Sequence, residues 1–145
     1  MTDDNGWAND HVAIQSLLGR IAHLADTGDL ADYRDCFIDD AEWWPPRQPT
    51  VDISEEPIRG SAALVAGAQQ RRDKGIQGPG TNTRHVVSTF DIEPDGPDRA
   101  RSRAYWRYYV ETDSTPRLHS IGRYDDELVR TADGWRMRIR KVSRG

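Results

Sequence analysis

The first quarter of the chain carries apolar residues at helical spacing. They follow Asn9 and Asp10, either of which can cap a helix, and they share one face of it: Ile14, Leu17, Leu18, Ile21, Ala22 and Ala25. Gly28 supplies the C-terminal stop of this helix. The spacing therefore predicts an amphipathic helix that buries one side, preceded by a flexible N-terminus over residues 1–9.

Two shorter helices and one strand are predicted next. Asp29 can cap a short helix over residues 30–37, and Ser61 opens another helix that closes near residue 75. The sequence AEWW between them predicts a short strand, which the two prolines that follow end because proline cannot continue a ladder. Residues 47–58 are predicted to form an irregular loop. The later segment GIQGPGTN is typical of a loop at the rim of a site.

From residue 83 onward the sequence alternates with the period of a strand. Strands are predicted over residues 83–92, 99–112, 118–130 and 135–142, with turn sequences such as EPDGPD and TADG between them. In the second strand the apolar and aromatic face carries Ala100, Ala104, Trp106, Tyr108 and Val110, and the opposite face carries Arg101, Arg103 and Arg107. In the last strand Trp135, Met137 and Ile139 alternate with Arg136, Arg138 and Arg140. The arginine rows predict a solvated convex face or a subunit interface, and less readily contacts with an anionic substrate.

Helices followed by a strand meander predict an α+β fold. We expect one domain over residues 1–145, built as a cone-shaped, curved antiparallel β-sheet wrapped around the N-terminal helices. Such a sheet leaves a cavity between its concave face and the helices, which is a usual place for a small-molecule site. Only 36% of the residues are hydrophobic, but five Trp and five Tyr add large buried areas to the core.

The composition restricts the class of partner. The formal net charge is -4 and the arginines are scattered, so we expect no nucleic-acid partner. No apolar run approaches the ~18 residues of a membrane span, and the acidic N-terminus is unlike a signal peptide. The single cysteine, Cys36, excludes an internal disulfide and fits a reducing compartment. We therefore expect a cytoplasmic protein that does not contact a membrane.

Four segments of the chain resemble one protein superfamily. They are AIQSLLGRIAHLADTGDLADYRDCFIDDAEWW, RGSAALVAG, TNTRHVVSTFDIEPDG and GRYDDELVRTADGWRMRIRKV. Over roughly residues 10–143 the chain thus resembles the SnoaL-like, nuclear-transport-factor-2-like superfamily, which implies its α+β barrel. This fold hosts dehydratases, isomerases, cyclases, epoxide hydrolases and proteins without activity, so the fold alone does not fix a reaction.

Within the superfamily the pattern is most similar to scytalone dehydratase, hexachlorocyclohexane dehydrochlorinase and bile-acid 7α-dehydratase. In those enzymes an Asp at a helix end orients a strand His, which removes a proton during elimination. Asp26 in LADTGD and His85 in TRHVVS fall on these two positions, so the resemblance implies His85 as base and Asp26 as its partner. Two assisting groups do not carry over. This chain has WRYYV where scytalone dehydratase has a second His, and Ile21 where the dehydrochlorinase has a helix lysine.

Without the resemblance, the spacing of Asp26 and His85 does not decide whether either residue is catalytic. Asp26 follows Leu18 and Ala22 on the buried side of the helix, where an unpaired acid is costly. It could instead turn to solvent or cap the Gly28 turn. His85 lies on a strand whose two faces both look half-buried, and a strand histidine is often structural. If the two meet, the carboxylate would make the imidazole a competent base near neutral pH.

Aromatic residues are the candidates for the wall of the pocket. Tyr108 is the first candidate for an assisting acid, because it replaces the missing His region on the face of Trp106, and Tyr33 ranks next. The predicted substrate contacts are Tyr33, Trp43, Trp44, Trp106, Tyr124 and His119. Ordinary packing is the alternative for most of these, and a rim or surface position is the alternative for His119 and for His23. Asp125 and Asp126 are expected to be exposed.

No motif indicates a metal or a cofactor. The four histidines lack the spacing of a metal site, and GIQGPG lies between a helix and a strand, the reverse of the order that a phosphate loop needs. The Arg-x-Asp strand motif of the epoxide hydrolases of this fold is also missing. We therefore expect cofactor-independent chemistry without a metal.

The sequence favours a lyase, dehydratase or isomerase that acts on a small hydrophobic cyclic molecule through His85 and Asp26. The alternatives are a non-catalytic module that binds a hydrophobic ligand, and a structural subunit like the small subunit of ring-hydroxylating dioxygenases. Contact between the two residues in an open cavity would favour catalysis, whereas a filled cavity would favour the alternatives. Folds of this class often assemble through the open face of the sheet, so we expect a homodimer or homotrimer.

Overall fold

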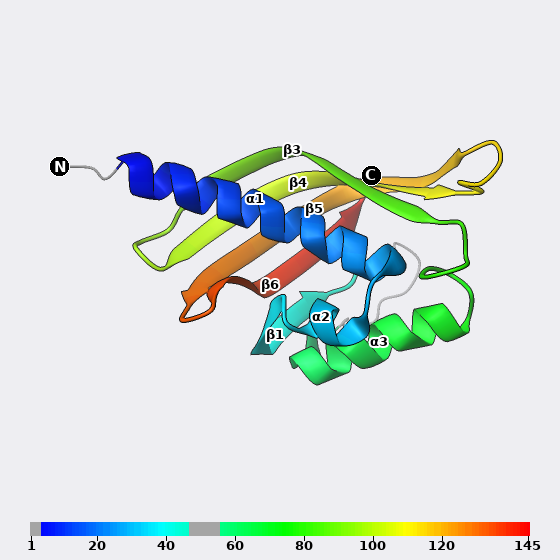
Figure 1. Ribbon diagram of the computed structural model, residues 1–145, viewed down its shortest axis with the longest axis horizontal. Helices are drawn as coiled ribbons and strands as arrows, with labels where there is room; N and C mark the ends of the chain where they lie inside the picture. Colours follow the sequence, from blue (N-terminus) through cyan, green and yellow to red (C-terminus); the bar gives the residue numbers. More distant parts are fainter. Residues whose placement is uncertain (1–3, 47–55) are drawn as a thin grey trace.

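The computed structural model describes residues 4–46 and 56–145, in which three helices accompany a curved six-stranded sheet (Figure 1). The helices are α1 (Asp4–Thr27), α2 (Leu30–Arg34) and α3 (Ser61–Asp73). The strands are β1 (Phe37–Trp44), β2 (Ile58–Arg59), β3 (Arg84–Pro94), β4 (Arg99–Val110), β5 (Arg117–Thr131) and β6 (Gly134–Arg144). Helices first and a long meander afterwards confirm the predicted α+β fold. Residues 1–3 of the predicted N-terminus and most of the predicted loop at 47–58 lie outside the described residues.

Helix α1 carries the predicted apolar face and lies along the sheet in Figure 1. Ile14, Leu17, Leu18 and Ile21 are almost fully buried in the main core. Burying four such side chains contributes several kcal/mol, since each contributes roughly 1.5–3 kcal/mol relative to exposure. In the part of the chain that the structure describes, no helix is long and apolar enough to cross a membrane.

The start of α1 differs from the prediction. The helix begins at Asp4, so neither Asn9 nor Asp10 caps it. Asp10 instead lies within the helix and accepts hydrogen bonds from both terminal nitrogens of Arg130 and from the indole nitrogen of Trp135. The hydrogen bond from Arg130 lowers the pKa of Asp10, so this link between α1 and the sheet is present at neutral pH and is lost as the pH falls below the usual aspartate range.

The two short helices begin where predicted, but α2 ends early. The Asp29 side chain caps α2 by accepting from the backbone N–H groups of Ala31 and Asp32. The helix stops at Arg34, and Phe37, expected in this helix, already belongs to β1. Helix α3 begins at Ser61 as expected, and its buried residues pack it beside α2 and β1.

The sheet has the strand order β2-β1-β6-β5-β4-β3, with β3 to β6 as the predicted antiparallel meander. The predicted curved antiparallel sheet is confirmed, with one parallel pairing that the sequence did not indicate, between β1 and β6. From the sequence, Ile58 was expected in a loop. In the structure it belongs to the short strand β2 and pairs with Trp43 of β1. In β4 the predicted two faces are confirmed: the even positions from Ala100 to Tyr108 are buried.

Irregularities in the ladders change which side chains face inward. In β3 the register shifts between Ser88 and Asp91, where Thr89 has a φ of 59°. In β6 Met137 pairs with Leu128 and Ile139 with Glu127, which leaves Arg138 as an extra residue. A bulge of this kind reverses the alternation of the strand beyond it. Past Arg138, the inward positions of β6 are therefore the even ones.

Gly122 offers a test of how closely the sheet is packed around the bulged strands. A Cβ at this position would clash with the backbone carbonyl of Ser143 and lie 2.5 Å from the ring of Trp106. We expect Gly122→Ala to lower the free energy of unfolding by about 1–3 kcal/mol, as overpacking does. The matched control is Gly19→Ala in α1, where a Cβ meets nothing within 4 Å. There, helix propensity should raise the free energy of unfolding by about 0.5–1 kcal/mol. Chemical denaturation measures both variants. An unchanged free energy of unfolding in Gly122→Ala would contradict the close packing around this residue.

Candidate active site

Asp26 and His85 are in direct contact. Asp26 lies in the last turn of α1 and accepts two hydrogen bonds from His85: Nδ1 of the imidazole at 2.7 Å and the backbone N–H at 2.9 Å. The Asp26 side chain is 5% exposed and that of His85 17%. The carboxylate therefore binds the residue at two points, which fixes both the strand position and the orientation of the ring. With Nδ1–H donating to the carboxylate, Nε2 of the neutral imidazole carries the free lone pair.

The end of α1 that carries Asp26 is held by α3. The terminal guanidinium nitrogen of Arg72 donates to the carbonyls of Leu24, Ala25 and Gly28 at 2.9, 3.3 and 2.8 Å. The Leu24 carbonyl also accepts from the backbone N–H of Gly28 at 3.0 Å. All three carbonyls lie at the C-terminal end of α1, where a cation is favourable. Gly78, with a φ of 101°, leaves room for the Arg72 side chain, because a Cβ there would lie 2.5 Å from it. Arg72 thus fixes the turn from which Asp26 reaches His85.

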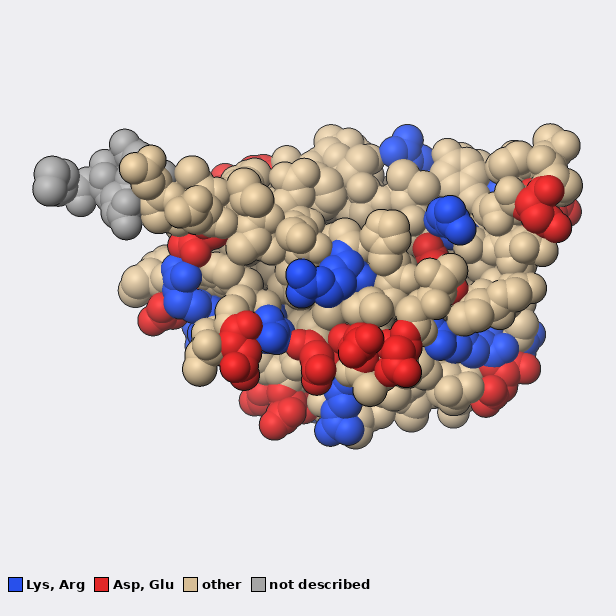
Figure 2. All heavy atoms as spheres, viewed as in Figure 1, with Lys and Arg blue, Asp and Glu red and all other residues tan. Residues whose placement is uncertain are grey.

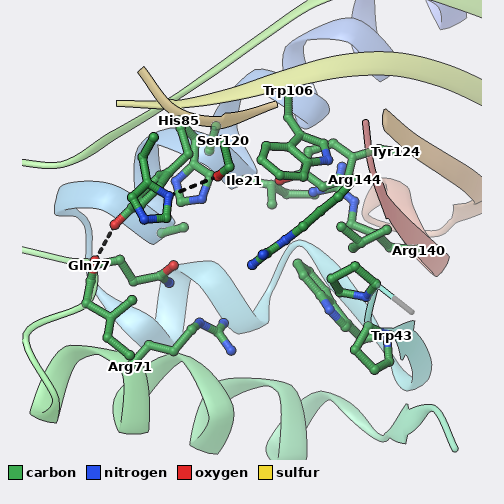
Figure 3. A pocket seen from close by; sticks show the side chains of 18 of the residues that line it. Ile21, Trp43, Arg71, Gln77, His85, Trp106, Ser120, Tyr124, Arg140 and Arg144 are labelled. Atoms are coloured by element: carbon green, nitrogen blue, oxygen red, sulfur yellow. Dashed lines mark hydrogen bonds between the residues drawn. The ribbon is translucent and has the colours of Figure 1, made fainter. Parts of the chain in front are cut away.

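A cavity of about 330 Å³ opens beside the imidazole (Figure 3). Helix α1 contributes Ile21, Ala22 and Ala25 to its wall, and the sheet contributes His85 together with aromatic residues. Its aromatic and histidine lining comprises Tyr33, Trp43, Trp106, Tyr108, His119 and Tyr124. Among the described residues no side chain is hydrogen bonded to His85 Nε2. The volume suits a one- or two-ring molecule.

Most of the residues predicted for the site are brought together, but one is not. His85 and the six other aromatic and histidine residues on the wall were all named from the sequence. Trp44 does not line the cavity: its indole nitrogen donates to Glu42 and its ring faces Lys141, because adjacent residues of a strand point to opposite faces. His23, the other histidine near Asp26, is exposed and does not line this cavity.

Tyr108 packs against His85, with ring centroids 4.8 Å apart. Its hydroxyl donates to the backbone carbonyl of Ile76, in the glycine-rich segment between α3 and β3. Burial raises the pKa of the phenol above its usual value. Tyr108 therefore connects the wall of the cavity to the loop at its rim, and its proton is already engaged by a backbone acceptor.

Asp126 and Arg140 form a buried ion pair, which corrects two expectations. Asp126 was expected to be exposed and Arg140 to lie on an outer arginine row, yet their side chains are 0% and 3% exposed. They face each other across β5 and β6 and make two hydrogen bonds of 2.9 Å. The bulge at Arg138 is the physical reason, because it turns Arg140 inward. The even positions of β5 already pointed to Asp126, since it follows Tyr124 and precedes Leu128 at period 2.

Arg140 of this ion pair forms part of the cavity wall. The guanidinium carbon of Arg140 lies 3.7 Å from the ring centroid of Tyr124 and 5.7 Å from that of Trp43. Burial would lower the pKa of Arg140, but the charge and hydrogen bonds of Asp126 outweigh it and raise that pKa. Burial also raises the pKa of Tyr124 to about 12. The cavity thus contains a neutral tyrosine under a guanidinium whose charge Asp126 balances.

Sequence reasoning missed four further polar residues of the wall: Arg71, Gln77, Ser120 and Arg144. Arg71 comes from α3, and Arg144 follows Arg140 and Val142 on the inward side of β6 beyond the bulge. Only the bulge could have indicated Arg144, and a bulge leaves no mark in a period-2 pattern. Over the described ranges, no group of three or more His, Cys, Asp or Glu side chains is placed to hold a metal ion.

Comparison with known proteins identifies the family and the fold. The sequence matches the SnoaL-like domain family over residues 8–141, which is nearly the whole chain. The chain belongs to the SnoaL-like family. No curated protein matches the sequence.

Solved structures with the same fold include proteins of three kinds. An NTF2-like protein with a cystatin-like fold from Novosphingobium aromaticivorans is 21% identical, with 95% of this chain and 83% of that chain covered and a TM-score of 0.79. Rv3472 from Mycobacterium tuberculosis, a protein of unknown function, is 22% identical over 100% of this chain and 77% of that one, with a TM-score of 0.80. A protein provisionally named a scytalone dehydratase, also from N. aromaticivorans, is 17% identical over 97% and 87%, with a TM-score of 0.74. At these identities the likeness shows the fold alone.

The buried ion pair can be tested through its stability. Arg140→Met leaves the Asp126 carboxylate buried without a partner, and we expect a loss of about 3–5 kcal/mol in the free energy of unfolding. The double variant Arg140→Met/Asp126→Leu removes both charges and should recover most of that loss. The exposed pair Arg123–Asp125, with an N–O distance of 2.8 Å, supplies the control: Arg123→Met should cost at most about 1 kcal/mol. Equal losses in the two single variants, measured by urea unfolding, would contradict the burial of this pair.

Proposed function

We propose that this protein is a cofactor-independent lyase or isomerase in which His85 acts as general base. The observation that carries the proposal is the contact of His85 Nδ1 with the buried Asp26 at 2.7 Å while the ring lies on the wall of an open cavity. A base needs a fixed tautomer, a free lone pair and room for a substrate beside it, and this arrangement supplies all three.

In the proposed reaction His85 Nε2 removes a proton from a carbon next to an electron-withdrawing group. The C–H bond electrons form a double bond, and a hydroxide or halide leaves with the electron pair of its own bond. In an isomerisation the proton returns instead to another carbon of the same molecule. Asp26 stabilises the imidazolium formed during the transfer. A positioned base of this kind contributes about 10²–10⁴ in rate, and the remainder comes from orientation and from exclusion of water.

Departure of the leaving group needs a second polar group. Tyr108 remains our proposal for this role, because its ring is beside His85. Its hydroxyl would have to leave the Ile76 carbonyl to donate to a substrate, which couples the assisting group to a movement of the rim segment. Trp43, Trp106, Tyr33, Tyr124 and His119 would contact the substrate, and their aromatic rings suit a cyclic hydrophobic molecule.

The non-catalytic alternatives receive less support from the geometry. A structural subunit does not need an open cavity, and a binding module for an apolar ligand does not need a buried carboxylate behind an imidazole. Burying the Asp26 carboxylate and the His85 imidazole carries a desolvation cost that a purely apolar wall would avoid. The family includes dehydratases and isomerases, which agrees with the enzymatic reading.

Replacing His85 tests the base directly. The assay is a panel of cyclic β-hydroxy ketones, alkyl halides and enones, with 5-nitrobenzisoxazole as a general reporter, since its ring opening needs only removal of one proton. We expect His85→Gln to lower turnover by about 10²–10⁴ while the fold is retained. Asp26→Asn should also lower turnover, because the amide offers its hydrogen-bond acceptor at only one of the two points.

The matched control is His23→Gln, one turn before Asp26 on the exposed side of α1. This variant should keep wild-type turnover and thermal stability. Turnover by His85→Gln equal to that of wild type would remove His85 as the base. Wild-type protein that binds ring compounds without converting any member of the panel would favour the binding module.

A homodimer or homotrimer remains part of the proposal. On the outer face of the sheet, Val86, Tyr105 and Ile121 surround Arg107 on three neighbouring strands, and Tyr105 and Ile121 are 51% and 46% exposed. Large apolar side chains gathered on one exposed sheet face are a feature of interaction surfaces. This face lies opposite to the cavity, so association there would leave the site accessible.

Light scattering after size-exclusion chromatography tests the assembly. We expect wild-type protein to elute with twice or three times the chain mass and Ile121→Asp to elute as a monomer. Val12→Asp, which places the same charge at an exposed apolar residue of α1, should keep the wild-type mass. A monomeric wild-type protein would refute the proposed assembly and would leave the proposal for His85 and Asp26 unaffected.

A further inference from the structure

The cavity holds more positive charge than its own acids balance. Three arginines line it: Arg71 from α3, and Arg140 and Arg144 from β6. Arg140 is neutralised by Asp126. The side chains of Arg71 and Arg144 have no ion-pair or hydrogen-bond partner within residues 4–46 and 56–145.

The rest of the lining does not compensate these two cations. No Asp or Glu stands among the described lining residues, and the nearby Asp26 is bonded to His85. Acidic side chains gather outside instead, over α2 and the adjoining strand in Figure 2, where Asp29, Asp32 and Asp35 are exposed. Arg71 and Arg144 thus have no acidic counterpart on the described wall of the cavity.

The two guanidinium groups lie where they can share one ligand. In Figure 3 Arg144 extends between Trp106 and Trp43 into the open space, and Arg71 points into the same space from the side of Gln77. His85 lies on the opposite wall from Trp43. Arg71 is half-buried and Arg144 is exposed at the mouth of the cavity, so both are accessible to a ligand. A guanidinium is a planar fork of donors that matches a carboxylate.

We propose that the ligand of this cavity is a ring-bearing carboxylate. Arg71 and Arg144 bind the carboxylate, and Trp43 and Trp106 contact the ring. The preference for an anion follows from the arginines alone; only the placement of the reacting carbon beside His85 rests on the proposed function. In that placement the same two cations also stabilise the negative charge that develops on the substrate when its proton is removed.

Two probes of equal shape separate charge from ring recognition. We would titrate the full chain with 1-naphthoate and with the neutral 1-naphthamide by calorimetry. The carboxylate should bind at least about tenfold more tightly, the lower end of what a charge-assisted hydrogen bond contributes. Arg71→Gln and Arg144→Gln should each weaken naphthoate by about tenfold and leave naphthamide unchanged. Arg144→Lys should recover part of the loss, because it retains the charge.

Two controls identify the source of the preference. Arg99→Gln makes the same change of charge at an exposed arginine in β4 that does not line the cavity, and it should alter neither affinity. His85→Gln should keep the preference for naphthoate even if it abolishes turnover, which separates this proposal from that of the base. Thermal melting checks that each variant is folded.

Several results would overturn the proposal. One is equal affinity of wild-type protein for the two probes, and another is no binding of either. A loss in Arg99→Gln as large as in the cavity variants would assign the effect to overall charge. The preference for naphthoate over naphthamide could also persist in Arg71→Gln and Arg144→Gln but disappear in His85→Gln. That result would show that the carboxylate binds the imidazolium of His85 instead of the two arginines.

Discussion

The site depends on one carboxylate that binds a strand residue at two points. Asp26 accepts from both the backbone and the imidazole of His85, so α1 and β3 are joined where the candidate base lies. Because the acid is buried, it is tolerated only while both hydrogen bonds are made. Arg72 in turn fixes the last turn of α1 through three carbonyls. The position of the imidazole is thus determined by three separate elements of the chain.

Local patterns were sufficient for the main elements. The apolar face from Ile14 to Ile21 and the alternation in β4 each arise within one segment, so periodicity alone located them. Asp26 could be placed on the buried side of α1 from its spacing to Leu18 and Ala22. Its pairing with His85 spans 59 residues and followed from the resemblance to a family, since helical spacing contains no information about distant partners.

The parts of the fold and the site that the sequence did not predict depend on contacts between several strands. The start of β1 at Phe37 and its parallel pairing with β6 are set by tertiary contacts. The extra residues at Thr89 and Arg138 reverse the facing of everything beyond them, and no residue type marks them. This is why Arg140 was assigned to the outer face and Arg144 was missed, whereas Asp126, on an uninterrupted part of β5, could have been placed correctly. Asp10 resembled a helix cap because its partners, Arg130 and Trp135, are distant in sequence.

Two consecutive residues of α3 contact different parts of the candidate site. Arg71 reaches into the cavity, and Arg72 holds the turn that carries Asp26. A shift or rotation of this last turn of α3 therefore moves a cation of the cavity and the support of the base together. A ligand that binds Arg71 therefore contacts the same turn of α3 that supports Asp26, and through Asp26 the imidazole of His85.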